Sequence, residues 1–93
     1  MPIVGEVNGR LIAGQVDRLL ITEKTVLVID YKTGREPPAT VEATPEIYLR
    51  QMAAYMSLLS KLFPKHEKRA ALLWTDGPNL MPLKEEFLHR YLP

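Results

Sequence analysis

Residues 14–34, GQVDRLLITEKTVLVIDYKTG, decide the fold of this chain. Within them, residues 15–22 and 25–32 are rich in β-branched and apolar side chains, which predicts two β-strands. Glu23-Lys24 lies between them as the predicted turn of an antiparallel hairpin, although it lacks the Asn or Gly that favours two-residue turns.

The length of this turn sets which residues oppose one another. A two-residue loop pairs Leu20 with Leu27 and Asp17 with Asp30, whereas a three-residue loop would shift the pairing by one. Directly opposed residues point to the same face, with Cβ atoms about 4.5–5.5 Å apart. Lys32 follows Asp30 by two residues and points the same way. The sequence therefore predicts two carboxylates and one ammonium group at one end of a hairpin.

Two opposed carboxylates need a positive charge between them. Like charges across a ladder are destabilising, and ionised carboxylates on a half-buried sheet need partners. Lys32 supplies one charge, but Mg²⁺ is the better candidate because it binds through one or two carboxylates and keeps several waters.

Composition limits the class of protein. The chain has 93 residues, 46% hydrophobic and 25% charged, which predicts a single small globular domain over residues 1–93. The net charge of +1 does not mark a nucleic-acid binder, so any such surface must come from local clusters. There is no cysteine, which excludes disulfides and thiolate metal sites. No apolar run approaches the roughly 20 residues of a membrane span.

The remaining segments extend an α/β pattern of order β-β-β-α-β-β-α. Asn8-Gly9 predicts a tight turn that pairs Val7 with Arg10. Gly14 within a strand suggests a bulge or a close backbone approach. Residues 35–44 read as a polar loop and residues 64–69 as a basic connector, followed by strands over 70–75 and 80–83 and a helix over 84–92. Pro82 places the last strand at an edge.

A helix is predicted between these strands. Thr44 is its expected N-cap and Pro45 its first residue, and Pro64 ends it after Phe63. An apolar stripe runs along one face, and it consists of Tyr48, Met52, Tyr55, Leu59 and Leu62. Gln51 and Tyr55 are i and i+4 and therefore neighbours.

The spacing of Asp17, twelve residues, and Asp30-Tyr31-Lys32 resembles the signature of PD-(D/E)XK nucleases. Gln51-Met52-Ala53-Ala54-Tyr55 is similar to the Gln-x-x-x-Tyr motif of the RecB-type branch. The likeness covers about residues 5–83 and is greatest to the carboxy-terminal nuclease domains of AddA-type helicase–nucleases.

This resemblance implies a restriction-endonuclease-like core, a mixed sheet of about five strands that lacks the usual first helix, in a truncated domain. The implied cofactor is Mg²⁺, with Mn²⁺ as a substitute and no iron–sulfur cluster. In this branch a further metal ligand, usually a His, comes from the upstream region, and neither His66 nor His89 lies in a matching place. The implied catalytic residues are Asp17, Asp30, Lys32, Gln51 and Tyr55.

The remaining implied contacts involve metal and DNA. Asp17, Asp30 and the backbone carbonyl of Tyr31 would bind the metal. Lys32 would stabilise charge in the transition state, because an ammonium beside two carboxylates is expected to stay protonated. The implied DNA contacts are Arg18, Thr33, Arg35 and Gln51.

The implied role is that of a DNA exonuclease domain in an AddAB/RecBCD-type, ATP-dependent helicase–nuclease for double-strand break repair in the bacterial cytoplasm. No Walker motif occurs, so the helicase would lie elsewhere in the parent polypeptide, beside an AddB-like partner subunit. An exposed strand edge would favour a homodimer. Three alternatives stay open: an inactive DNA- or partner-binding module, another enzyme of this fold, and an ordinary cross-strand ion-pair cluster.

Overall fold

The computed structural model describes residues 2–34, 36–77 and 79–93. Within these residues, six strands, two α-helices and one 3-10 turn follow one another. In order they are β1 (Pro2–Val7), β2 (Arg10–Gln15), β3 (Arg18–Ile21), β4 (Thr25–Lys32), the 3-10 turn η1 (Val41–Ala43), α1 (Glu46–Leu62), β5 (Glu67–Trp74), β6 (Asn79–Leu83) and α2 (Glu85–His89).

The strands form two sheets. β1 and β2 make an antiparallel hairpin, and the other strands make a four-stranded sheet in the order β3-β4-β5-β6. β4 and β5 are parallel, with α1 as the crossover between them, and the other neighbours are antiparallel. The predicted mixed α/β fold is confirmed, although six strands in two sheets replace about five in one.

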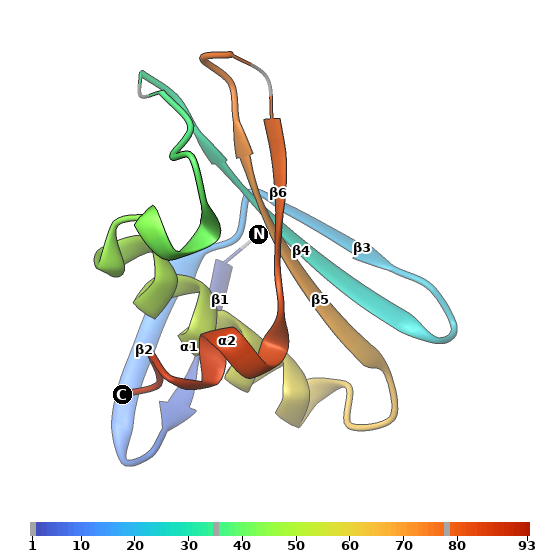
Figure 1. Ribbon diagram of the computed structural model, residues 1–93. Helices are drawn as coiled ribbons and strands as arrows, with labels where there is room; N and C mark the ends of the chain where they lie inside the picture. The colour runs from blue at the N-terminus through green and yellow to red at the C-terminus, as the bar shows by residue number, and fades with distance from the viewer. Residues whose placement is uncertain (1, 35, 78) are drawn as a thin grey trace.

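Helix α1 lies between the two sheets, as Figure 1 shows. It contacts β1 on one side and β5 on the other, and α2 packs beside it. Two glycines let the hairpin approach the helix closely, because a Cβ atom at Gly5 would overlap Leu58 and one at Gly14 would overlap the Tyr55 hydroxyl. The overlap with Tyr55 confirms the close approach predicted at Gly14, which pairs in register with Ile3 and does not form a bulge.

The two hairpin turns are built differently. Asn8 and Gly9 both have positive φ, 51° and 79°, as the predicted Asn-Gly turn requires. Glu23-Lys24 lacks that chemistry, and Thr22 compensates for it: its hydroxyl accepts hydrogen bonds from the backbone N–H of Lys24 and of Thr25. The two-residue loop follows, and the predicted register of β3 on β4, with Leu20 opposite Leu27, is confirmed.

The predicted strand over residues 15–22 is wrong at its start. β2 ends at Gln15 and β3 begins at Arg18, so Val16-Asp17 forms the passage from one sheet to the other. Val16 is buried with 1% of its surface exposed, and it anchors this passage in the core. Asp17 therefore lies just before β3 and not within it.

Several smaller details also differ. The N-cap of α1 is Pro45, and the Thr44 hydroxyl donates to Met81 Sδ instead of capping the helix. Leu62, at the helix end, is 63% exposed, while the middle of the stripe is buried. The basic connector is shorter than predicted because β5 already begins at Glu67, and α2 ends at His89. The predicted loop over 35–44 contains the η1 turn.

β6 is an edge strand, as Pro82 predicts, and β3 is the other edge. Neither helix in the described part of the chain is long and apolar enough to cross a membrane.

Candidate active site

Asp17 and Asp30 meet where β3 begins and β4 approaches its end. Asp17 Oδ2 accepts a hydrogen bond of 2.8 Å from the backbone N–H of Tyr31. This side-chain contact extends the pairing of β3 on β4 by one step, because the ladder itself begins at Arg18 and Ile29. Asp30 is 5% exposed and lies on the sheet face that α1 covers, next to Leu72 of β5.

The two carboxyl groups interact, and their pKa values shift in opposite directions. The hydrogen bond to Asp30, with help from the Tyr31 N–H, lowers the pKa of Asp17. Burial first, and the Asp17 carboxyl second, raise the pKa of Asp30 against the opposing influence of Lys32. Asp30 is thus the member of the pair that holds a proton more readily.

Lys32 is held by three groups. Its Nζ atom lies 2.7 Å from Asp30 Oδ2 and donates a 3.3 Å hydrogen bond to Gln51 Oε1. It also lies 4.0 Å from the centre of the Tyr48 ring, within the range of a cation–π contact. The ammonium therefore joins the strand carboxylates to helix α1.

Gln51 and Tyr55 reach the site from one face of α1. The Tyr55 hydroxyl donates a 3.3 Å hydrogen bond to the carbonyl of Gln15, two residues before Asp17. Burial, reinforced by the negative charge of Asp30, raises the pKa of Tyr55, while hydrogen bonds to Gln15 and to Gln51 oppose this. The structure brings all five predicted catalytic residues into one connected cluster.

The predicted DNA contacts are more scattered. Arg18 is exposed as the first residue of β3, and Thr33 is exposed just after β4. Arg35 lies outside the described residues. The Tyr31 side chain is 42% exposed, and its backbone N–H is used by Asp17.

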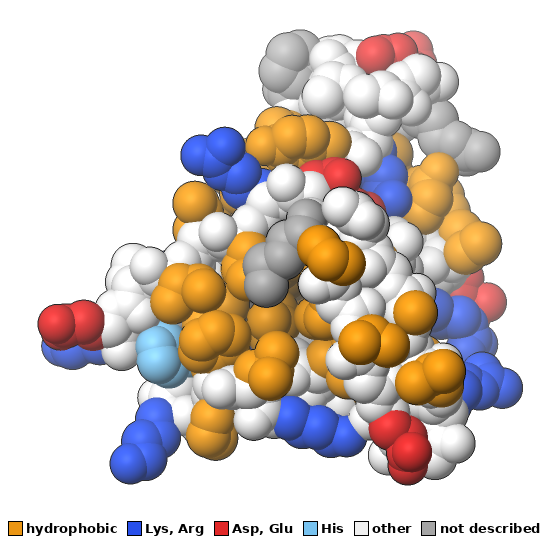
Figure 2. Space-filling model, turned by 180° about the vertical axis from the view of Figure 1, so that it is seen from behind, with side chains coloured by type: hydrophobic (Ala, Val, Ile, Leu, Met, Phe, Trp, Pro, Cys, Tyr) orange, Lys and Arg blue, Asp and Glu red, His pale blue; other side chains and the backbone are white. Residues whose placement is uncertain are grey.

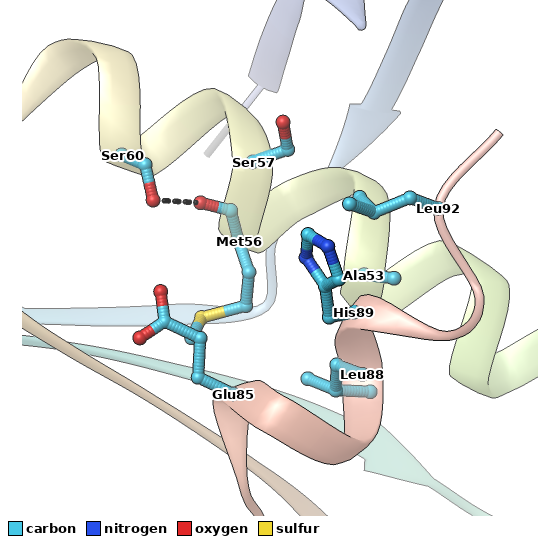
Figure 3. A pocket seen from close by; sticks show the side chains of 8 residues that line it. All are labelled: Ala53, Met56, Ser57, Ser60, Glu85, Leu88, His89 and Leu92. Atoms are coloured by element: carbon cyan, nitrogen blue, oxygen red, sulfur yellow. Dashed lines mark hydrogen bonds between the residues drawn. The ribbon is translucent and has the colours of Figure 1, made fainter. Parts of the chain in front are cut away.

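Neither histidine completes the acid pair. His66 Nε2 lies 3.0 Å from the carbonyl of Thr22, at the turn end of the β3–β4 hairpin and away from Asp17. His89 lines a pocket between α1 and α2 together with Glu85, Ser57 and Ser60, none of which belongs to the cluster (Figure 3).

On one face of the molecule, the described charged side chains do not form one broad basic surface. Figure 2 shows the face opposite to the view of Figure 1, with Lys and Arg dispersed around its rim among Asp and Glu and with hydrophobic side chains gathered in its middle. Any nucleic-acid contact on this face must therefore be local, in line with the net charge of +1.

Sequence reasoning treated Tyr48 only as a core residue and missed its contact with Lys32. Tyr48 precedes Gln51 by three residues and lies on the same helix face. Its proximity to Lys32 could therefore have been predicted from the expected position of Gln51 beside the active site. Trp74 packs its ring edge-on against Tyr48 at 6.2 Å between centres. Its buried indole N–H has no hydrogen-bond partner among the described residues.

The donor set fits a hard divalent cation. Asp17 and Asp30 supply two carboxylates held side by side, one of them nearly buried. Among the described residues no group of three or more His, Cys, Asp or Glu side chains could hold a metal ion. Two carboxylates suffice for Mg²⁺, which usually keeps several waters.

Comparison with known proteins agrees with this geometry. No curated protein and no solved structure matches the chain. The family model described as the PD-(D/E)XK nuclease superfamily matches residues 3–88, which include every member of the cluster. Because this match spans nearly the whole chain, the chain belongs to the PD-(D/E)XK nuclease superfamily.

Proposed function

We propose that the chain is a metal-dependent deoxyribonuclease, an exonuclease that hydrolyses DNA phosphodiester bonds with Mg²⁺ or, in its place, Mn²⁺. The observation that carries the proposal is the connected cluster of Asp17, Asp30 and Lys32 in a chain of this superfamily. An ordinary surface ion pair would not be nearly buried, as Asp30 and Lys32 are, and would not need the second carboxyl group of Asp17 beside it.

Asp17 and Asp30 would hold the cation through their carboxylate oxygens, and the carbonyl of Tyr31 would add a further oxygen. When bound, the cation polarises the scissile phosphate and lowers the pKa of a bound water. Lys32 places a fixed positive charge beside the pair, where it stabilises the negative charge that develops on the phosphate in the transition state. Because Asp30 and Gln51 already hold its Nζ atom, little reorganisation is needed during the reaction.

Gln51 and Tyr55 act on different neighbours. Gln51 is partly exposed, so its carboxamide orients Lys32 and can also meet a phosphate or water. Tyr55 is only 3% exposed and cannot touch DNA, so it is a positioning residue that fixes the backbone of Gln15 just before Asp17. Arg18 and Thr33 contact DNA phosphates beside the cluster.

The domain serves a RecB-type, AddA-like helicase–nuclease in the repair of double-strand breaks in the bacterial cytoplasm, with an AddB-like partner subunit. This role rests on the Gln51-x-x-x-Tyr55 motif following the Asp-x-Lys motif. It predicts restored ATP-dependent DNA degradation when the chain is added to such an enzyme with an inactivated AddA nuclease site. The exposed edge strand β3, with Ile21 51% exposed, would support a homodimer, which light scattering tests.

The central experiment measures the cleavage of end-labelled linear DNA and of covalently closed circular DNA with Mg²⁺, with Mn²⁺ and with EDTA. We expect metal-dependent shortening of the linear DNA alone, because an exonuclease needs an end. Asp17→Asn and Asp30→Asn should each lower cleavage at least about a hundredfold. The control Asp76→Asn, in an exposed turn, should cleave like the wild type. Cutting of the circle would contradict the exonuclease.

A second candidate is a catalytically inactive module that binds DNA or a partner protein. It is favoured by the 2.7 Å ion pair, because Lys32 already neutralises the carboxylate that would hold the metal. In that case Mg²⁺ should not bind in calorimetry, and no metal should support cleavage, while DNA binding persists.

A further inference from the structure

A groove of about 250 Å³ lies beside the candidate active site, between β2, the first turns of α1 and the carboxy-terminal segment. Its lining includes Arg10, Ile12, Ile47, Arg50, Gln51 and Tyr91, and we call it the arginine groove. It is continuous with the site because Gln51 lines the groove and at the same time accepts the hydrogen bond of Lys32.

The charge of the groove suits an anion. Arg10 and Arg50 carry the charged side chains of its lining, and no Asp or Glu side chain lines it among the described residues. Pro93, the last residue of the sequence, also lines it, and its backbone oxygen accepts a hydrogen bond from Asn8. Arg50 is exposed and pairs with Glu46 on the next helical turn at 3.2 Å, which occupies only part of a guanidinium that has five N–H donors. Arg10 is exposed as well, so both guanidinium groups are available to phosphate oxygens.

The apolar wall of the groove favours single-stranded over double-stranded DNA as the ligand. Ile47 is 71% exposed, and Ile12 and Tyr91 lie with it as partly buried apolar side chains. A duplex keeps its bases stacked inside and presents sugars and phosphates, which would leave this wall facing charge. An unpaired strand offers both phosphates for the arginines and base faces for apolar, aromatic and guanidinium surfaces.

We propose that the arginine groove binds single-stranded DNA and leads an unpaired strand past Gln51 to the carboxylate pair. Arg10 and Arg50 bind its phosphates, and Ile47 and Tyr91 contact its bases. The proposal rests on the proposed nuclease function and deepens it, since it names an unpaired strand as the substrate and the face on which that strand enters.

The test measures binding apart from cleavage. Fluorescence anisotropy of a labelled oligothymidylate and of a duplex of equal length is recorded in EDTA at several salt concentrations. The variants are Arg10→Glu, Arg50→Glu and Ile47→Ser. Arg69→Glu is the matched control, because Arg69 is also exposed and pairs with a glutamate, Glu67, at 3.3 Å, but lies on the four-stranded sheet. Thermal unfolding verifies that each variant is folded.

We expect tighter binding of the single strand than of the duplex by the wild type. Arg10→Glu and Arg50→Glu should each weaken single-strand binding roughly tenfold. Each should also reduce the slope of log affinity against log salt by about 0.7 or more, because a phosphate contact is lost. Ile47→Ser should weaken binding with the slope unchanged. Arg69→Glu should have a much smaller effect.

The outcomes separate this proposal from the nuclease itself. A wild type that cleaves DNA while both groove variants bind like Arg69→Glu overturns the arginine groove and leaves the nuclease intact. Equal or tighter binding of the duplex by a cleaving wild type also overturns it. A chain that binds single strands through the arginines but cleaves nothing with any metal supports the groove and overturns the nuclease.

Discussion

Lys32 Nζ lies 2.7 Å from Asp30 Oδ2, and the two side chains are only 13% and 7% exposed. A nearly buried ion pair of this kind contributes little net stability by itself, because desolvation offsets the attraction. Here the lysine also offsets the repulsion between Asp30 and Asp17. The carboxylate of Asp30 is thus both the partner of Lys32 and a proposed metal ligand. Lys32 and the cation would therefore both offset the negative charge of the aspartate pair.

Replacing Lys32 should separate metal binding from catalysis. Lys32→Gln keeps a hydrogen-bond donor for Asp30 but removes the charge, so Mg²⁺ should bind as tightly as before or more tightly. Cleavage should fall by about two to three orders of magnitude, because the positive charge beside the phosphate is lost. Calorimetry and cleavage of end-labelled DNA measure the two effects. Lys61→Gln, at the far end of α1, is the control, and cleavage equal to that of the control would refute the proposed role of Lys32.

Metal affinity should depend on pH through Asp30. Burial and the neighbouring Asp17 raise the pKa of Asp30, so its carboxyl gains a proton at a higher pH than an ordinary aspartate. A proton and a cation compete for this carboxylate, and affinity should therefore decline as the pH falls through that raised pKa. Calorimetry over a descending pH series, in two buffers of different ionisation enthalpy, measures the affinity and the protons released. Affinity independent of pH in this range would show that Asp30 is not a ligand.

Asp30→Asn should stabilise the fold at neutral pH while it abolishes metal binding. The pKa of Asp30 is higher in the folded state than in the unfolded state. Protonation of Asp30 therefore favours the folded state: the full contribution to stability is present below the unfolded-state pKa, and it is lost as the pH rises through the folded-state pKa. The neutral amide avoids that loss, so the variant should gain up to about 1 kcal/mol above this range and nothing well below it. Thermal unfolding of both proteins against pH measures the difference. A variant less stable than the wild type at neutral pH would mean that the Lys32 contact outweighs the repulsion.

Much of this arrangement was predictable because it depends on local sequence. The two-residue spacing of Glu23-Lys24 fixed the register that brings Asp17 opposite Asp30, and helical periodicity placed Gln51 beside Tyr55. The residue that closes the turn, Thr22, was not predicted as its stabilising element, because side-chain hydrogen bonds can replace the Asn or Gly that pattern rules require.

The parts that were not predictable depend on contacts between distant segments. The residues from Gln15 to Thr22 are mostly apolar or β-branched, but the strand breaks at Val16-Asp17, where Val16 is buried as the chain passes from one sheet to the other. In the same way, Thr44 suits an N-cap by residue type, but its hydroxyl is directed to Met81, far along the chain. The arginine groove is lined by residues of β2, α1 and the carboxy-terminal segment, which are far apart in the sequence. No local sequence pattern predicts that these segments lie together.

Tyr55→Phe should weaken the site without removing any group that touches DNA or metal. The change keeps the buried ring but loses the 3.3 Å hydrogen bond to the Gln15 carbonyl, at a cost of about 1 kcal/mol in the free energy of unfolding. Looser backbone before Asp17 should lower Mg²⁺ affinity as well. Thermal unfolding and calorimetry measure both, with Tyr31→Phe, which removes an exposed hydroxyl, as the control. Lower stability with full metal affinity would restrict Tyr55 to a purely structural role.

Gly14→Ala should disturb the same contact from the other side. A Cβ atom at Gly14 would overlap the Tyr55 hydroxyl and approach Cε1 and Cζ to 2.9 and 3.0 Å, so the hairpin and α1 must separate. Overpacking of this kind costs about 1–3 kcal/mol. The double variant with Tyr55→Phe removes the closest atom and should recover part, but not all, of that loss, since the ring carbons remain. Unfolding free energies of the four proteins form a double-mutant cycle. If the two losses simply add, the steric contact between Gly14 and Tyr55 does not limit how closely the hairpin approaches the helix.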